Sequence, residues 1–218
     1  MGWTANVPNQ LSELFIAACR NVRRPVLDIG CAYGVASLPA RANGARVIAN
    51  DLAHEHLHEL RGRPHVHPLQ GRFPYLGFAP GSLDAIHASN VLHFLTGAEV
   101  LEGAARLHEW LAPGGCVYIQ AGTPYQGPFA PFVPEYTARF ARGEQWPGWV
   151  ESTRSITSYR RLNQYPASIH LLDDNVLGRV FLGAGFAIER LWLYRRRDLP
   201  ASMFLDGREN VGLVARKA

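Results

Sequence analysis

The stretch VLDIGCAYG (residues 26–34) predicts a short, fully buried strand that leads directly into a glycine-bearing turn. Pro25 ends the segment before it, and a helical pattern follows over residues 35–43, with Gly44 placed to end that helix. Glycine accepts positive φ and lets a ligand approach the backbone closely. The stretch is therefore typical of a ligand-binding turn between a strand and a helix.

The same alternation of strand and helix extends along the chain from this turn. Helices are predicted over residues 11–22, 35–43, 52–62, 98–111 and 173–185. Strands are predicted over residues 26–30, 45–51, 66–69, 83–89, 116–122, 186–196 and 210–217. Such alternation predicts an α/β fold whose mostly parallel sheet is covered by helices on both faces. The last two strands can pair as an antiparallel hairpin.

The composition of the 218-residue chain fits one globular domain spanning residues 1–218. Hydrophobic residues make up 47% and charged residues 18%, which excludes global disorder. We expect no membrane segment and no secretory leader, because no apolar run approaches the ~20 residues of a membrane helix. The three cysteines lie far apart, which favours a reducing, cytoplasmic location.

The charge pattern argues against two kinds of site. The net charge is +4, but the arginines are scattered along the chain, so we do not expect nucleic-acid binding, which usually needs a clustered basic face. Five histidines between residues 54 and 67 suggest a metal site, yet the cysteines lie elsewhere in the sequence. A solvated histidine-rich helix is the favoured interpretation, and no metal site is predicted.

Residues 124–168 interrupt the alternation with a segment rich in proline, glycine and aromatic residues. Its aromatic residues are Tyr125, Phe129, Phe132, Tyr136, Phe140, Trp146, Trp149, Tyr159 and Tyr165. A segment this long between regular elements is usually functional. We interpret it as an insertion that forms a lid or cap over a substrate. A small helical core of its own and a homodimer contact stay open as alternatives.

The chemistry around the glycine turn narrows the choice of ligand. The turn lacks the spacing of a dinucleotide-binding G-x-G-x-x-G, and no Gly-Lys-Ser/Thr of a phosphate loop follows it. Asp28 precedes the turn, where a carboxylate would repel a diphosphate and attract a cation. Asp51 ends the second strand, where an acid can accept both hydroxyls of a ribose. These features together indicate S-adenosylmethionine.

The chain resembles class I S-adenosylmethionine-dependent methyltransferases over nearly its whole length. The matching segments, in order, are VLDIGCAYG (26–34), VIANDL (47–52), GSLDAIHASNVLHFL (81–95), LHEWLAPGGCVYIQ (107–120) and LLDDNVLGRVFLGAGFAIERL (171–191). This resemblance implies a seven-stranded Rossmann-like sheet that is mostly parallel, with an antiparallel last strand and helices on both faces.

The resemblance also implies roles for particular residues. Asp28 would lie near the methionine amino group, directly or through water, Asp51 would hold the ribose, and Leu52 would pack on the adenine. The turn beneath the cofactor would consist of Gly30, Cys31, Ala32 and Gly34. The tip of the fourth strand, Ala88, Ser89 and Asn90, would border the methionyl part.

Two positions depart from the family pattern. Ala32 replaces the middle glycine of the turn, which is a mild change. Arg72 stands where many members carry an acid that accepts a hydrogen bond from the adenine amino group, and arginine cannot accept one. The adenine edge is then left to Gln70, to backbone groups, or to the carbonyl near Phe73. We therefore place Arg72 and Phe73 beside the cofactor.

Methyl transfer from an activated sulfonium mainly requires orientation of the two reactants, although an alcohol or amide acceptor also needs a general base. The candidates are His93 and His170, each of which could instead be a structural histidine. Trp3 lies in an N-terminal arm that can fold over the cofactor in related enzymes. We expect a methyltransferase that acts on a small molecule by O- or N-methylation. The alternatives are a protein or RNA methyltransferase and a catalytically silent cofactor-binding module.

Overall fold

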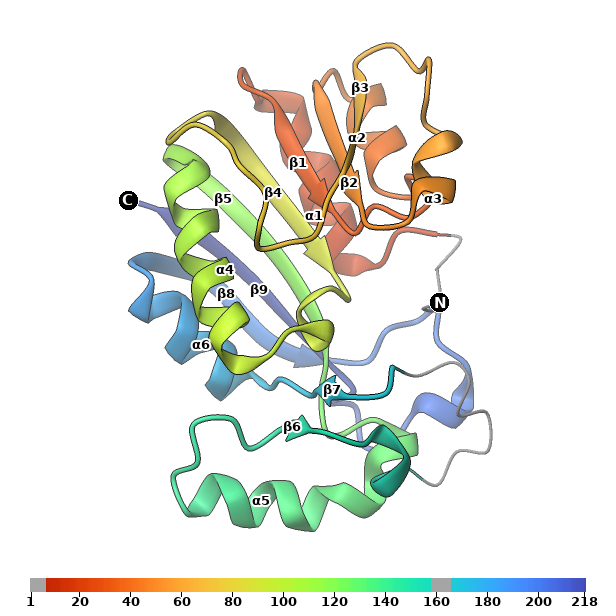
Figure 1. The fold of residues 1–218 in the computed structure, drawn as a ribbon, viewed down its shortest axis with the longest axis vertical. Helices are drawn as coiled ribbons and strands as arrows, with labels where there is room; N and C mark the ends of the chain where they lie inside the picture. Colours follow the sequence, from red (N-terminus) through yellow and green to blue (C-terminus); the bar gives the residue numbers. More distant parts are fainter. Residues whose placement is uncertain (1–6, 158–165) are drawn as a thin grey trace.

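A computed structural model describes residues 7–157 and 166–218 of the chain. Seven strands form one sheet in the order β3-β2-β1-β4-β5-β9-β8 (Figure 1). The expectations for Trp3, Tyr159 and Tyr165 lie outside the described residues. None of the helices within the described ranges is long and apolar enough to cross a bilayer.

The strands confirm the predicted seven-stranded, mostly parallel architecture. Their bounds are β1 (Val26–Ile29), β2 (Val47–Asp51), β3 (Val66–Gln70), β4 (Leu83–Ser89), β5 (Leu111–Gly122), β8 (Phe186–Tyr194) and β9 (Asn210–Lys217). β9 runs antiparallel to both of its neighbours, β5 and β8, as the hairpin prediction required. The strand order reverses at β1, which pairs in parallel with β2 and with β4. The carboxyl ends of these three strands form the edge where parallel sheets bind ligands, called the carboxyl edge below.

Helices cover both faces of the sheet, because the central strands carry apolar side chains on both of their faces. The helices on one face are α1 (Gln10–Ala18), α2 (Ser37–Ala42) and α3 (His54–His58), and those on the other are α4 (Gly97–Trp110) and α6 (Asp174–Gly183). In β1, Val26 packs in the cluster built around α1, whereas Leu27 and Ile29 pack in the cluster with α4 and α6. A strand buried on both faces is the expected state for a parallel sheet.

Side-chain caps fix where two of the helices begin. The Asn9 side chain accepts the backbone N–H groups of Leu11 and Ser12 at 3.0 Å and so starts α1. Thr96 and Glu99 form a reciprocal capping box at the start of α4. Each cap satisfies backbone donors that have no partner inside the helix.

The segment between β5 and α6, which consists of the predicted insertion and the few residues after it, contains several short elements. They are η3 (Gly127–Phe132), α5 (Val133–Ala141), β6 (Trp149–Val150), η4 (Thr153–Ser155) and β7 (Ile169–His170). Figure 1 shows α5 and β6 set apart from the seven-stranded sheet. Their apolar side chains form a separate small core of Phe129, Phe132, Tyr136, Val150, Ile169 and Leu171. Much of the aromatic content of this segment therefore stabilises the segment itself.

Two elements differ most in extent from the prediction. Helix α3 ends at His58, and the residues up to Gly62 form turns, because only Leu57 and Leu60 of this segment bury apolar side chains. Strand β5 starts at Leu111, five residues before the predicted strand. Leu111 already pairs with β4, and a register shift between Leu83 and Ala85 of β4 accommodates the Pro-Gly-Gly segment.

Helix α4 allows a direct test of the packing against the sheet. We expect Leu107→Ala to lower the free energy of unfolding by about 2–5 kcal/mol, because it leaves a cavity in the core. Leu107 is fully buried, whereas Leu101 on the same helix is 45% exposed. Leu101→Ala is the matched control and should change stability by no more than about 0.5 kcal/mol. Denaturant midpoints measure both, and equal losses would contradict this packing.

Candidate functional site

The glycine turn leaves β1 with three residues in the left-handed region. Gly30 has φ +66°, Ala32 φ +47° and Gly34 φ +81°. A side chain at Gly30 would approach a methyl carbon of Val91 to 2.6 Å, so this position accepts only glycine without a shift. Ala32, which replaces the middle glycine of the family pattern, adopts the same kind of conformation. The turn thus keeps the path of a glycine loop in spite of the substitution.

Asp51 links the turn to the end of β2. Its Oδ2 accepts the backbone N–H of Ala32 at 2.9 Å, and its Oδ1 accepts the backbone N–H of Ala53 at 2.9 Å. The Nδ1 atom of His56 lies 3.2 Å from the same Oδ1. An ionised carboxylate offers about four acceptor sites. Asp51, at the carboxyl edge, can therefore accept further hydrogen bonds from a ligand.

Apolar side chains are exposed beside this acid. Leu52, predicted to pack on the adenine, is 64% exposed, and Tyr33 is 49% exposed. The rings of Tyr33 and His56 meet edge to face with centroids 4.6 Å apart. Sequence reasoning did not assign Tyr33 or His56 to the site, although Tyr33 lies within the glycine-bearing turn. An exposed leucine next to an acid with free acceptor sites offers an apolar surface for the flat face of a base.

Asp28 is held from two directions beneath the turn. Its side chain is buried, with Ser37 Oγ donating to Oδ2 at 2.6 Å and His87 Nδ1 donating to Oδ1 at 2.7 Å. The other ring nitrogen of His87 lies 3.0 Å from Ser12 Oγ. His87 was missed in the sequence, although β4 pairs with β1 so that His87 stands directly beside Asp28. The place of Asp28 near a methionine amino group stays a prediction.

Arg72 and Phe73 turn toward α4. The guanidinium of Arg72 pairs with Glu99 at 2.7 Å and lies over the ring of Tyr75 at 5.3 Å. Burial raises the pKa of Glu99, but hydrogen bonds from Thr96 and the Arg72 charge outweigh it and hold this pKa below its usual value. The Phe73 side chain is buried in the main core. The contact of Arg72 and Phe73 with a cofactor stays a prediction. Because both side chains are engaged elsewhere, the backbone of Phe73 is the group that could make this contact.

The amide of Gln70 is the polar side chain placed beside Leu52. Its Nε2 donates to the Leu52 carbonyl at 3.2 Å. The neighbouring Asn50 donates to the carbonyls of Leu69 and Gly71, each at 3.0 Å, which fixes the start of the loop after β3. Because Gln70 donates through its nitrogen, its carbonyl oxygen stays available as an acceptor at this end of the site.

A buried polar network joins the tips of β4 and β5. Ser89 donates to Gln120 Oε1 at 2.7 Å and accepts from the side chain of Asn9 at 2.9 Å. Gln120 in turn donates to the side chains of Asn90 at 3.1 Å and Asn210 at 3.0 Å. This network fixes Ser89, one of the predicted cofactor contacts, against the N-cap of α1.

The two candidate catalytic histidines come from segments that touch each other. His93 lies in η2 (Leu92–Phe94), just after β4, and β7 packs against this turn. His170 is fully buried in β7 and donates from Nδ1 to the Leu95 carbonyl at 3.0 Å. Its Nε2 is therefore an acceptor, and no described group bonds to it. The rings of Trp146 and Trp149 flank His170 edge to face.

Burial sets the protonation of both histidines. Desolvation lowers the pKa of His93 to about 4. Desolvation also lowers the pKa of His170 to about 4, although the hydrogen bond to Leu95 acts in the opposite direction. Both rings are thus neutral near pH 7, so each presents a lone pair as well as a donor.

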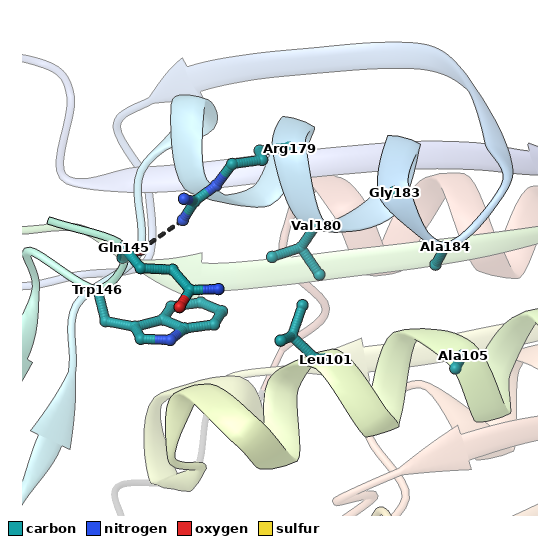
Figure 2. Close-up of a pocket in the computed structure, with 8 residues that line it drawn as sticks. All are labelled: Leu101, Ala105, Gln145, Trp146, Arg179, Val180, Gly183 and Ala184. Carbon is teal, nitrogen blue, oxygen red and sulfur yellow. Dashed lines mark hydrogen bonds between the residues drawn. The ribbon is translucent and has the colours of Figure 1, made fainter. Parts of the chain in front are cut away.

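Two pockets adjoin the insertion and not the glycine turn. One of about 220 Å³ lies between α4 and α6, where Leu101 and Val180 point toward each other and Trp146 closes one end (Figure 2). The other, of about 440 Å³, lies at the start of α4 beside Trp146 and Trp149. Within the described residues, no three histidine, cysteine or acidic side chains gather as a metal site.

The structure thus brings most of the predicted cofactor residues to one edge. Those at the carboxyl edge are Asp28, Gly30, Cys31, Ala32, Gly34, Asp51, Leu52 and Ser89. The arrangement can hold a nucleoside whose ribose meets an acid, whose base lies on apolar side chains and whose substituent lies over an open backbone turn. Arg72, Phe73, His93 and His170 lie to the side, toward α4 and the insertion.

Part of the chain is similar in sequence to known proteins. A family model described as a methyltransferase domain matches residues 26–115. A protein of Synechocystis sp., described as an uncharacterized methyltransferase, is 32% identical over 91 residues, which cover 41% of this chain and 43% of the relative. The match therefore spans less than half of that relative's length.

Solved structures with the same fold cover nearly the whole chain. An S-adenosylmethionine-dependent methyltransferase from Mesorhizobium loti has a TM-score of 0.67 at 19% identity and covers 94% of this chain and 97% of its own. A Burkholderia thailandensis 1,6-didemethyltoxoflavin-N1-methyltransferase, solved with bound 1,6-didemethyltoxoflavin and S-adenosylhomocysteine, has a TM-score of 0.65 at 16% identity, covering 96% of this chain and 77% of its own.

The strand order, with β9 antiparallel at its end, agrees with the architecture of these structures. The matched segment, residues 26–115, contains both the glycine turn and Asp51. The chain therefore has the fold of S-adenosylmethionine-dependent methyltransferases, and its residues 26–115 are similar in sequence to a methyltransferase domain.

Proposed function

We propose that this protein transfers a methyl group from S-adenosylmethionine to a small-molecule acceptor by O- or N-methylation. The observation that carries the proposal is the position of Asp51. Its carboxylate binds the glycine turn through Ala32 and keeps free acceptor sites beside the exposed Leu52. At this edge the acid matches the ribose hydroxyls of the cofactor, and the open turn matches its charged methionyl end. The apolar surface matches its adenine base.

The residues of the carboxyl edge fit the cofactor in chemistry as well as in place. Asp51 would accept hydrogen bonds from the ribose, Leu52 would contact the adenine, and the turn would lie beneath the methionyl part. The charge of Asp28 would favour the cofactor's ammonium group, acting through water or through space because the side chain is only 1% exposed. When bound, the cofactor supplies a methyl group already activated by its sulfonium. The protein's task is then to orient the acceptor and exclude water.

The insertion supports a small acceptor. Strand β7 packs on η2, the turn that follows β4, and the side chain of Trp146 packs on Gly97 at the start of α4. We infer that residues 124–168 act as a cap, which narrows access to the methyl group. The Burkholderia thailandensis 1,6-didemethyltoxoflavin-N1-methyltransferase, which has the same fold and was solved with 1,6-didemethyltoxoflavin bound, supports the proposal of a small acceptor. An extended protein or RNA acceptor would be expected to need a more open edge.

His170 is the better placed of the two candidate bases. Its Nδ1–H is occupied by the Leu95 carbonyl, so Nε2 can accept a proton or a hydrogen bond from an acceptor hydroxyl or amine. The rings of Trp146 and Trp149 shield the His170 ring from solvent. Because its pKa is lowered, His170 is a weak base that is unprotonated near pH 7. Such a base suits a methyl acceptor that needs orientation more than deprotonation.

Removal of the Asp51 carboxylate tests the cofactor site. We expect Asp51→Ala to weaken binding of S-adenosylhomocysteine by about 1–3 kcal/mol, the range for hydrogen bonds to a charged group. Calorimetry measures the affinity. Asp84→Ala is the matched control: Asp84 also accepts two backbone N–H groups, from Arg23 and Arg24, but lies at the opposite end of β4. Unchanged affinity in Asp51→Ala would place the ribose elsewhere.

The acceptor class has its own test. Methyl-labelled S-adenosylmethionine is incubated with the protein and a cell extract, and the label is then divided between low-mass products and precipitable macromolecules. The proposal expects protein-dependent label among the low-mass products. Label confined to protein or RNA would replace the small-molecule assignment, and binding without any transfer would indicate a silent cofactor-binding module.

The buried His170 also predicts how stability depends on pH. Between the ordinary histidine pKa near 6.5 and the folded value of about 4, the unfolded chain binds a proton that the folded chain does not. The free energy of unfolding is therefore highest above pH 6.5 and falls as the pH drops toward 4, by up to about 3 kcal/mol for this residue. His93 acts in the same direction.

Denaturant unfolding between pH 7 and 4 measures this effect in the wild type and in His170→Leu. The variant should be less stable at pH 7 but lose less stability as the pH falls. His58→Gln, which changes an exposed histidine, should keep the wild-type slope. A slope that is the same in all three proteins would show that folding does not lower the pKa of His170.

A further inference from the structure

A buried chain of hydrogen bonds runs from α1 to the acid beneath the glycine turn. Ser12, His87 and Asp28 are each no more than 3% exposed. The contacts are 3.0 Å from Ser12 Oγ to His87 Nε2 and 2.7 Å from His87 Nδ1 to Asp28 Oδ1. The ring of Phe15 stacks on His87 with centroids 5.0 Å apart, which holds the imidazole in this plane. Neither the fold nor the proposed chemistry requires a histidine at this position.

The contact with Asp28 determines that Nδ1 of His87 carries a proton, whereas Nε2 has two possible states. A carboxylate can only accept, so Nδ1 of His87 donates to Asp28. In the neutral ring Nε2 accepts from the Ser12 hydroxyl, and in the charged ring Nε2 donates to the Ser12 oxygen. The serine can serve both forms, since a hydroxyl is both donor and acceptor. The Asp28–His87 pair therefore carries a net charge of −1 or of zero without breaking a hydrogen bond.

The other titratable groups around the pair are held neutral. Burial and the nearby Asp28 charge raise the pKa of Cys19, at the end of α1, to about 12. The same two causes raise the pKa of Cys31 in the turn. Burial raises the pKa of Tyr118, the neighbour of His87 on β5. Ser37 of α2, the remaining partner of Asp28, does not titrate. Asp51 lies across the turn, on the nucleoside side of the site.

We propose that His87, held by Ser12, is a positioning residue that sets the orientation and the net charge of Asp28. In this way His87 controls the affinity of the site for ligands that carry an amino-acid ammonium group. This inference rests on the proposed function, because it takes the cofactor's methionyl end to lie above Asp28. With a neutral His87, the negative charge of Asp28 attracts the ammonium. With a charged His87, that attraction is largely cancelled.

A pair of ligands isolates this effect. S-adenosylhomocysteine carries the ammonium group, whereas 5′-methylthioadenosine has the same nucleoside and thioether but no amino-acid part. The quantity of interest is the ratio of their dissociation constants, measured by calorimetry at a series of pH values between about 5.5 and 8. Effects on the ribose side, such as those of His56 near Asp51, act on both ligands and cancel in the ratio.

In the wild type, the preference for S-adenosylhomocysteine should rise by about fivefold or more from the low to the high end of this range. In His87→Gln, which keeps an amide donor but cannot become charged, the preference should be independent of pH. It should also exceed that of the wild type at low pH by a similar factor. A histidine with a merely structural role would not produce tighter relative binding when it is replaced.

Ser12→Ala is a milder second variant, which keeps the test valid if His87→Gln does not fold. Without the hydroxyl, Nε2 loses its partner and His87 is less firmly held against Asp28, so the preference should fall at high pH. His58→Gln, which changes an exposed histidine outside the site, is the matched control and should keep the wild-type profile. If the ratio of dissociation constants does not vary with pH in the wild type, or varies equally in His87→Gln, the proposed role of His87 is wrong and the proposed function is unaffected. Failure of the wild type to bind either ligand overturns the proposed function as well.

Discussion

The carboxylate of Asp51 is the contact on which the geometry of the site depends. One of its oxygens accepts the N–H of Ala32 in the turn after β1, and the other accepts the N–H of Ala53 after β2. Two successive strand-to-helix connections are thereby joined by one charged group at the carboxyl edge. Hydrogen bonds to a charged acceptor are about twice as strong as neutral ones. They keep Ala32 at positive φ, so the backbone of the turn stays open toward a ligand.

Polar side chains elsewhere along this edge are fixed by one another and not by solvent. Gln120 is fully buried and bonds to the tips of β4 and β9. Asp28 is likewise buried and bonded through both oxygens. Such networks are costly when incomplete and rigid when satisfied. A rigid carboxyl edge suits methyl transfer, in which the protein contributes mainly orientation. The insertion adds a second, separately packed layer beside it, which carries His170.

Much of the site could be predicted because its residues follow one another along the chain. The turn at residues 30–34 and the acid at position 51 both follow buried strands, and in a parallel sheet all such positions come to one edge. His87 could not be found in this way. Its partnership with Asp28 arises from the register of two strands that are adjacent in the sheet but more than fifty residues apart in sequence. The contact of Arg72 with Glu99 has the same origin, since it joins a loop to a helix.

The sequence by itself determined the class of fold, the order of its strands and helices, and the turn with its two acids. Local patterns suffice there, because hydrophobic periodicity and glycine positions act over a few residues. Only the tertiary structure decided which groups share a proton or a charge. Burial made His170 neutral and left its Nε2 without a partner, and strand pairing set His87 against Asp28. Desolvation and hydrogen bonding depend on what surrounds a side chain in space, which a linear pattern does not specify.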